Sequence, residues 1–229
     1  MPRAAQLPLA VIALSGGMDS CVTAAIAARP SRLALLHVTY GQRTARRERQ
    51  AFDDIAAFYR VPQRLRLVAG LDHLARIGGS SLTDPDIRVR TSGRIGRQIP
   101  SSYVPFRNTQ ILSVAVAWAE ALGAPHVYIG AVAQDSSGYP DCRPEYFQAF
   151  QQLVDLGTKP DTRITIVTPV LHLSKADIVR KGIELGAPLH LTWSCYQNED
   201  IACGKCDSCL LRLRGFQQAG VPDPIPYAS

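Results

Sequence analysis

The sequence has none of the features that mark membrane, repeat or disordered proteins. No stretch approaches the ~20 consecutive apolar residues that a membrane helix needs. The 229 residues contain no internal repeat and no low-complexity segment. The apolar run from Leu7 to Leu14 follows Arg3 but lacks a convincing small-residue cleavage site, so we expect a buried strand there rather than a secretory signal. These absences predict a globular, cytoplasmic protein with no membrane partner.

An excess of negative charge is absent too, since 25 Lys and Arg residues against 19 Asp and Glu residues give a formal net charge of +6. This balance suits polyanionic ligands such as ATP. The basic residues are spread along the chain in modest clusters, which fits an ordinary solvated surface. We therefore expect no direct nucleic-acid partner. The 6 cysteines of a cytosolic chain are expected to be thiols or metal ligands rather than disulfides.

Apolar runs alternate with helical patterns from residue 9 to residue 186. The expected strands are 7–14, 32–40, 64–68, 126–130 and 164–168, with helices near 22–28, 44–59, 108–122, 144–154 and 175–185. This alternation predicts an α/β fold, a doubly wound parallel sheet with helices on both faces. Phe58, Leu153 and Ile183 continue the apolar stripes of their helices, so we expect them to face the core.

The chain is expected to divide into two parts of unequal size. We place an α/β domain in 1–190 and a small C-terminal segment, packed on that domain, in 191–229. Periodicity fails between residues 70 and 100, where glycine, serine, proline and arginine accumulate. A long stretch of this kind inside a domain indicates a lid, an interface or a flexible loop.

The stretch from Leu14 to Ser20 reads L-S-G-G-M-D-S and lies between an apolar run and an alanine-rich segment. A strand, a glycine turn and a helix in this order leave free amides at a helix N-terminus, where phosphate binds. Gly16 and Gly17 would let the backbone approach a polyphosphate, although glycines alone mark only a turn. The Walker A lysine is missing, and Asp19 beside phosphate requires a Mg²⁺ ion. The predicted ATP-binding residues are Leu14, Ser15, Gly16, Gly17, Met18, Asp19, Ser20, Cys21, Val22, Thr23 and Ala24.

Further polar residues follow the other predicted strands, at the edge where a parallel sheet holds its ligands. Gln42 and Arg43 follow the second strand, and the loop 134–144 follows the fourth. That loop crowds acids, an arginine and a tyrosine together, but Gly, Pro, Asp and Ser also make ordinary turns. Lys175, at a predicted helix start capped by Ser174, could reach a phosphate or could simply be solvated.

The C-terminal part holds Cys195, Cys203, Cys206 and Cys209, the last three spaced C-G-x-C-x-x-C. Such gaps let a tight turn place several thiolates on one ion, and sulfurs at roughly 2.3 Å complete a closed, tetrahedral Zn²⁺ site. A closed site is structural and supplies folding free energy on the order of 10 kcal/mol. Free cysteines, a redox pair and an iron–sulfur cluster are the alternatives. Cys142, outside this cluster, either packs or acts as a nucleophile.

Taken together, these motifs resemble one known family. They are the loop 14–20, Y-G-Q-R at 40–43, Y-V-P-x-R-N at 103–108, G-Y-P-D-C-R-P at 138–144, T-W-S-C-Y at 192–196 and C-G-x-C-D-S-C at 203–209. Over about residues 10 to 227 the chain is similar to the 7-cyano-7-deazaguanine synthases (preQ0 synthases) of the queuosine pathway. Its first loop resembles the PP-loop, S-G-G-x-D-S, of the ATP pyrophosphatase superfamily. The chain departs from the pattern at Phe106, where glycine is expected, and at Thr44 and Cys21.

The resemblance implies a homodimeric ligase that forms C–N bonds. It would convert 7-carboxy-7-deazaguanine, ATP and ammonia to the nitrile through an adenylated acid and an adenylated amide, with Mg²⁺ accompanying ATP and one structural Zn²⁺ per chain. The implied catalytic residues are Asp19, Arg107, Asp135, Asp141 and Arg143, and the implied substrate-binding residues are Gln42, Arg43, Asn108, Tyr139 and Lys175. Another PP-loop enzyme, such as a tRNA thiolase or an amide-forming ligase, and a non-catalytic zinc-ribbon nucleic-acid binder remain as alternatives.

Overall fold

The computed structural model of the chain describes residues 7–91, 99–133 and 138–228. Its strands are β1 (Leu9–Ala13), β2 (Arg32–Thr39), β3 (Arg66–Gly70), β4 (His126–Ile129) and β5 (Thr165–Val167). Its α-helices are α1 (Met18–Ala27), α2 (Ala45–Phe58), α3 (His73–Ile77), α4 (Arg107–Leu122), α5 (Pro144–Gly157), α6 (Lys175–Glu184) and α7 (Asp207–Ala219), with short 3₁₀ turns at Gln63–Leu65, Pro140–Cys142 and Leu189–Leu191. No helix among the described residues has the length and apolar character to cross a membrane.

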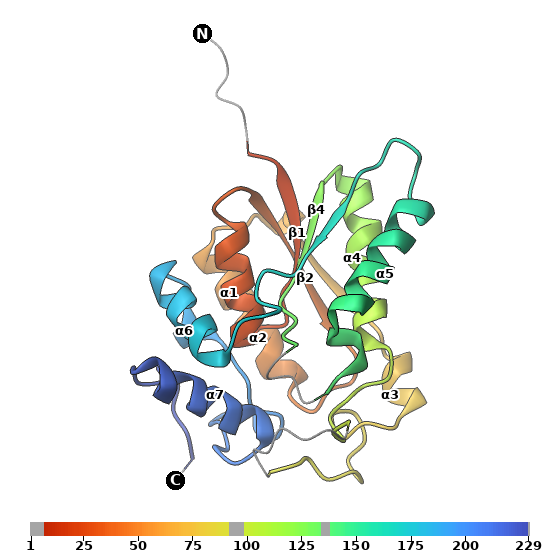
Figure 1. Cartoon of the computed structure of the whole chain (residues 1–229). Coiled ribbons are helices and arrows are strands. Elements are labelled where there is room, and N and C mark those ends of the chain that lie inside the picture. The colour runs from red at the N-terminus through yellow and green to blue at the C-terminus, as the bar shows by residue number, and fades with distance from the viewer. Residues whose placement is uncertain (1–6, 92–98, 134–137, 229) are drawn as a thin grey trace.

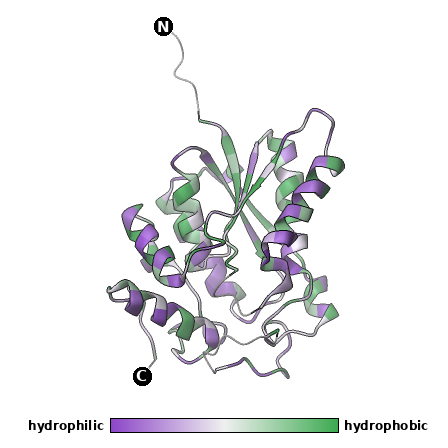
Figure 2. Ribbon diagram, in the orientation of Figure 1, coloured by the Kyte–Doolittle hydropathy of each residue, from purple (hydrophilic) through white to green (hydrophobic). Residues whose placement is uncertain are grey.

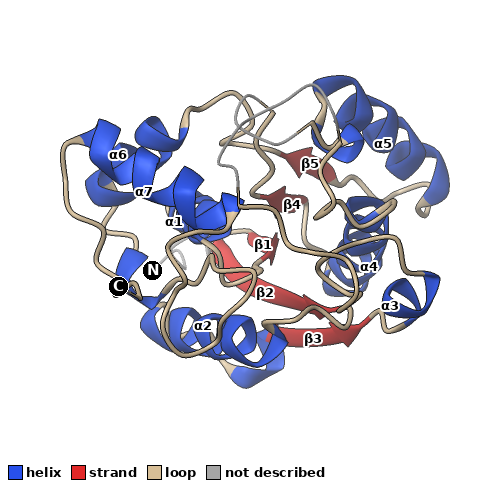
Figure 3. Ribbon diagram, turned by 90° about the horizontal axis from the view of Figure 1, so that it is seen from below, coloured by secondary structure: helices blue, strands red, loops and turns tan. Residues whose placement is uncertain are grey.

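The strands form one parallel sheet in the order β3-β2-β1-β4-β5, which confirms the predicted doubly wound fold. Helices α1 and α2 lie on one side of the sheet, and α4 and α5 lie on the other (Figures 1 and 3). The strand order reverses beside β1, because the chain first moves outward to β3 and then returns to β4. In sheets of this kind the ligand crevice lies at that reversal, outside the carboxyl ends of the strands.

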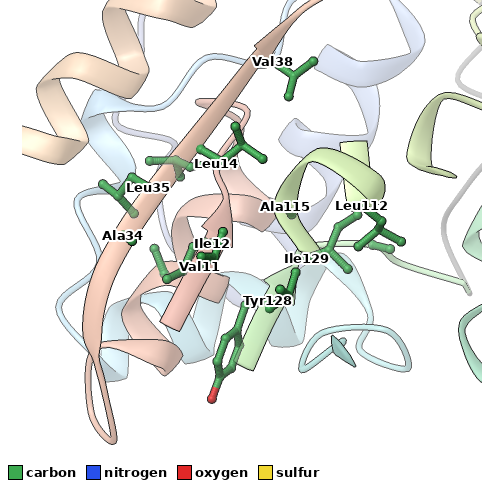
Figure 4. Packing of buried hydrophobic residues seen from close by; sticks show 14 of the residues in the cluster. Val11, Ile12, Leu14, Ala34, Leu35, Val38, Leu112, Ala115, Tyr128 and Ile129 are labelled. Atoms are coloured by element: carbon green, nitrogen blue, oxygen red, sulfur yellow. The ribbon is translucent and has the colours of Figure 1, made fainter. Parts of the chain in front are cut away.

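The central strands are buried on both faces, which explains why their sequences are continuously apolar rather than alternating. Val11 and Ile12 of β1 and Leu35 of β2 are each 0% exposed. Leu112 and Ala115 of α4 pack onto these strands from one side (Figure 4). The apolar residues concentrate in the strands and on the inner faces of the helices, whereas hydrophilic residues lie on the outer helix faces (Figure 2).

Several sequence predictions were wrong in detail. The third strand begins at Arg66 rather than at residue 64, because a 3₁₀ turn follows Pro62. Phe58, Leu153 and Ile183 are 49%, 57% and 51% exposed, so none of them faces the core as expected. Each lies at the margin of its apolar stripe or near the end of its helix, where the helix surface turns away from its packing partner.

The described residues between 70 and 100 are partly helical and partly buried. Helix α3 lies within it, and Ser80, Ser81 and Leu82 are buried. The Arg43 amide donates to the Leu82 carbonyl at 2.9 Å. This stretch therefore packs against the turn that follows β2.

The C-terminal segment contains a helix that the sequence patterns did not predict. Helix α7 packs along α6, which in turn packs against α1 (Figure 1). A methyl group at Gly215 of α7 would lie 2.8 Å from the Lys175 Cβ, so the glycine permits the close approach of α7 to the start of α6. Phe216 of α7 is buried in a shared apolar cluster with α1 and α6 residues.

Candidate functional site

The loop after β1 has the strand, glycine turn and helix that the sequence predicts. Gly17 is the N-cap of α1, and its amide donates to Ser15 Oγ at 3.2 Å. Ser20 Oγ donates to the Gly17 carbonyl at 2.9 Å and lies 3.1 Å from Ser15 Oγ. The first amides of α1 have no partner within the helix, so this end of α1 can receive an anion.

Two glycines, Gly16 and Gly130, allow the loop to pack closely against neighbouring main-chain atoms. Gly16 has φ +89°, and a methyl group there would lie 2.6 Å from the Glu48 carbonyl oxygen of α2. Gly130, directly after β4, has main-chain atoms of Asp19 and Ser20 within 2.8–2.9 Å of where its Cβ would be. The Gly16 carbonyl accepts a hydrogen bond from the Trp193 amide at 2.9 Å. The loop is therefore held between α2, β4 and the C-terminal segment.

A cavity of about 290 Å³ extends from this loop along the carboxyl ends of β1 and β4. The predicted residues that line it are Leu14, Ser15, Gly17, Met18, Asp19, Ser20, Arg107, Asn108, Tyr139 and Lys175. The cavity is also lined by Tyr40, Glu48, Ser102, Gly130, Cys142, Trp193, Ser194, Tyr196, Asp207, Ser208 and Arg212, among others. Segments that are far apart in the sequence thus converge at the predicted edge of the sheet.

At the loop end of the cavity, Lys175 and Asp19 form an ion pair. Lys175 Nζ lies 2.5 Å from Asp19 Oδ2. The other carboxylate oxygen, Asp19 Oδ1, is buried and has no hydrogen-bond partner among the described residues. A carboxylate oxygen of this kind, beside an anion-binding helix end, suits a hard cation such as Mg²⁺. The residues present therefore fit a metal-bound polyphosphate.

At the other end, an arginine lies among tyrosines. Arg107 Nη1 donates to Tyr40 Oη at 2.9 Å, and the guanidinium carbon lies 5.2 Å from the centroid of the Tyr40 ring. Tyr139 Oη lies 2.8 Å from Ser102 Oγ. Burial raises the pKa of Tyr40 to about 12, so the phenol stays neutral at physiological pH. This end combines flat aromatic surfaces with one fixed positive charge, which suits a planar, anionic ligand.

Asn108 and Asp141 hold this end of the cavity in shape. Asp141 Oδ2 accepts from the Asn108 amide at 3.0 Å and so caps the start of α4. Asn108 Nδ2 donates to the Asp141 carbonyl at 2.9 Å and to Cys142 Sγ at 3.4 Å. Asp141 does not line the cavity. Burial, followed by the nearby Asp141 charge, raises the pKa of Cys142 to about 12, which disfavours the nucleophilic reading of that thiol.

Other predicted site residues do not reach the cavity. Gln42 is buried, accepting from the Tyr40 amide at 2.8 Å and donating to Glu48 at 3.0 Å. The Arg43 guanidinium donates to the carbonyls of Ser81, Asp84 and Ile87 and thereby fixes the stretch after α3. Arg143 is exposed at the N-cap of α5. Gly16 of the loop and Cys21, Val22, Thr23 and Ala24 of α1 do not line the cavity, and Asp135 lies outside the described residues.

Some functional candidates were missed by sequence reasoning. Helix α2 begins with a charged run, residues 46–49, that looks like an ordinary solvated face in the sequence, and the Arg46 side chain is 67% exposed. Glu48 of the same run turns inward and lines the cavity. Nothing in the sequence distinguishes it from its neighbours, because the packing of α2 on Gly16 decides which side faces the loop. Three further lining residues lie within the sequence motifs and could have been predicted as site residues from them: Tyr40, Trp193 and Tyr196.

The four cysteines of the C-terminal segment come together as the spacing predicts. The Sγ atoms of Cys195, Cys203, Cys206 and Cys209 all lie within 4.8 Å of one another, and all four residues are buried. The amides of Asn198 and Cys203 donate to Cys195 Sγ at 3.3 and 3.4 Å. Backbone N–H donors to sulfur favour the thiolate form, which is the form that binds a metal. The cluster could therefore hold a metal ion with four sulfur ligands.

A buried ion pair connects this cluster to the cavity. Arg212 of α7 is 2% exposed and binds Asp223 through Nε at 2.8 Å and Nη2 at 2.9 Å. Its Nη1 also donates to Thr192 Oγ1 at 2.6 Å. Because Cys206 is the N-cap of α7 and Cys209 lies in its first turns, the cluster and the ion pair together fix the helix end that borders the cavity.

These features define a doubly wound α/β protein with a glycine-containing loop at the reversal of strand order, where an anion could bind, and a four-cysteine site beside it. A family model described as queuosine biosynthesis protein QueC matches residues 9–220, and the chain belongs to this family.

Similar proteins cover nearly the whole chain. A 7-cyano-7-deazaguanine synthase of Chloroherpeton thalassium is 58% identical over 219 residues, which are 95% of this chain and 96% of that protein. Proteins of the same name from Chlorobium chlorochromatii and Koribacter versatilis are each 56% identical. The first covers 95% of both chains, and the second covers 96% of this chain and 93% of its own.

Proposed function

We propose that this chain is a 7-cyano-7-deazaguanine synthase, an ATP-dependent ligase that converts 7-carboxy-7-deazaguanine and ammonia to the nitrile. The proposal rests on a single cavity with an anion-binding loop at one end and Arg107 among tyrosines at the other. The names of the similar proteins support it. An adenylating enzyme needs such a cavity, because it must hold a polyphosphate and the acid to be activated side by side.

The chemical problem is that a carboxylate is a poor electrophile, since oxide or hydroxide would have to leave. Transfer of AMP to the carboxylate oxygen supplies a good leaving group. In this proposal ATP lies on the loop from Leu14 to Ala24, with its phosphates at the N-terminus of α1 and near Lys175. Asp19 would hold the Mg²⁺ ion, which when bound offsets charge that develops on pyrophosphate.

The acid is proposed to bind at the Arg107 end. Arg107 would pair with the carboxylate, and Tyr40 and Tyr139 would pack against the flat deazaguanine. Asn108 and Asp141 support this end through the α4 cap described above, and Gln42 supports Tyr40 and Glu48. Arg43 and Arg143 do not line the cavity, so they would influence the bound acid only through their charge. The predicted contact of Asp135 with substrate or ammonia remains a prediction.

The cysteine cluster is proposed to bind structural Zn²⁺. Four thiolates leave no open coordination position, so the metal would stabilise the C-terminal segment rather than take part in the reaction. Cysteines that bind a metal must stay reduced. This requirement suits the reducing cytoplasm, where we propose that the protein works. A homodimer is expected from the resemblance alone.

The proposal is tested by incubating the purified protein with ATP, Mg²⁺, ammonium and 7-carboxy-7-deazaguanine and identifying the product by mass spectrometry. We expect the nitrile, together with AMP and pyrophosphate. Asp19→Asn should abolish pyrophosphate release without unfolding the protein. Absence of the nitrile with the wild-type protein would refute the proposed function, and unimpaired pyrophosphate release by the variant would refute the role of the loop.

A further inference from the structure

Three acids among the described residues line the cavity, and they differ in what they are bound to. Asp19 is paired with Lys175 at 2.5 Å. Asp207 Oδ2 lies 3.8 Å from Arg90 Nε. Glu48 has both oxygens held by neutral donors, Thr44 Oγ1 at 2.7 Å and Gln42 Nε2 at 3.0 Å.

Glu48 has interactions with residues at both ends of the cavity. Its backbone carbonyl packs on Gly16 of the phosphate loop. Its carboxylate interacts electrostatically with Arg107 and Tyr40 at the opposite end. The adenylate of the proposed reaction would form between the two ends, inside the cavity that Glu48 lines.

The surroundings of Glu48 favour proton uptake. Burial is the largest influence and raises its pKa, against the opposing hydrogen bonds from Thr44 and Gln42. The charge of Arg107 lowers the pKa, and that of Glu199 raises it. A general base works best with a pKa near the operating pH. A carboxylate in water, with its lower pKa, would be a weak base for this purpose.

The proposed reaction needs such a base, because ammonia in neutral solution is almost entirely ammonium and ammonium has no lone pair. We infer that Glu48 is the general base of the amination step, a catalytic residue that removes a proton from ammonium in the cavity. The freed lone pair forms the C–N bond with the adenylated carboxyl carbon. AMP leaves with the electron pair of the broken C–O bond and takes the second proton, which leaves the neutral amide. This inference rests on the proposed function.

The test separates amination from adenylation. Glu48→Gln keeps the size of the side chain but cannot accept the proton. In a single turnover we expect pyrophosphate release from the first adenylation to stay close to the wild-type rate, whereas amide and nitrile formation from ammonium falls by roughly 100-fold or more. Hydroxylamine is largely neutral at pH 7 and needs no deprotonation before attack. The variant should therefore still form the hydroxamate at nearly the wild-type rate, as measured by mass spectrometry.

Thr44→Val provides the matched control, since it removes a hydrogen bond that lowers the Glu48 pKa and leaves the carboxylate in place. Its rate of amination should fall off at a higher pH than the wild-type rate, and this shift also tests the inference if Glu48→Gln does not fold. The inference is overturned if Glu48→Gln aminates normally, or if it loses the ammonium and hydroxylamine reactions equally while still folded. It is also overturned if Thr44→Val leaves the pH profile unmoved. Failure of the wild-type protein to form any amide or nitrile would instead count against the proposed function.

Discussion

Gly130 allows a direct test of how the sheet positions the loop 14–20. A methyl group at this position would lie 2.8 Å from the Ser20 nitrogen and 2.9 Å from the carbonyl carbon and oxygen of Asp19. These neighbours are main-chain atoms, so they cannot move aside as the end of a flexible side chain would. Gly130→Ala is therefore expected to push the N-terminus of α1 out of place.

The expected losses of stability and of catalytic rate in Gly130→Ala follow from this crowding. Overpacking a well-packed site costs roughly 1–3 kcal/mol, and we expect the free energy of unfolding in urea to fall by that amount. The catalytic loss should be larger than the stability loss, because a displacement of about 1 Å in an active site can cost on the order of 100-fold in rate. Pyrophosphate release, measured well below the melting temperature, reports that loss.

Gly157→Ala is the matched control. Gly157 is the last residue of α5, and a methyl group there would meet nothing within 4 Å. Alanine at such a helical position is expected to leave activity unchanged and to raise the free energy of unfolding by up to about 1 kcal/mol. If Gly130→Ala matched the wild-type protein in both stability and rate, the proposed packing of β4 against the loop would be refuted.

Three further predictions concern stability. Arg212→Ala leaves the buried Asp223 carboxylate without its partner and should lower the free energy of unfolding by about 3–5 kcal/mol; a loss below 1 kcal/mol in urea titration would contradict the buried pair. Phe106 is 61% exposed and has φ 58°, a left-handed conformation that costs roughly 1–2 kcal/mol. Phe106→Gly should therefore be more stable than Phe106→Val, whose branched side chain suits this conformation worst, and the reverse order of melting temperatures would show that φ is negative. His37 is buried against Phe52, and burial is the main reason that its pKa is lowered. Its contribution to stability is complete above its ordinary pKa of about 6.5 and is lost as pH falls below that value, because the unfolded chain then binds the extra proton. Denaturation at a series of pH values should show this decline, and His37→Phe should reduce it; an equal decline in both proteins would assign it to other groups.

The parts that could be predicted from sequence are those in which neighbouring residues decide the structure. Strands buried on both faces leave continuous apolar runs, and a glycine turn between a strand and a helix is visible from the adjoining residues alone. The cysteine spacing brings Cys203, Cys206 and Cys209 together through one local turn. The Ser174 cap is equally local, since its hydroxyl accepts from the Asp177 amide three residues later.

The parts that could not be predicted depend on contacts between distant segments. Arg43 follows a strand at the correct edge, but the carbonyls of the stretch after α3 bind its guanidinium and hold it away from the cavity. Glu48 looks like any charge on a helix until Gly16 fixes which face of α2 meets the loop. Phe106 was noted only as a departure from glycine, and its positive φ explains why glycine suits that position.

The proposed function requires that one cavity support two adenylations, first of the acid and then of the resulting amide. The most direct test is the ratio of AMP to nitrile during turnover with isotopically labelled ammonium. We predict two AMP molecules for each nitrile and one labelled nitrogen in the product. One AMP per product, with the reaction ending at the amide, would contradict the second adenylation and identify an amide-forming ligase instead.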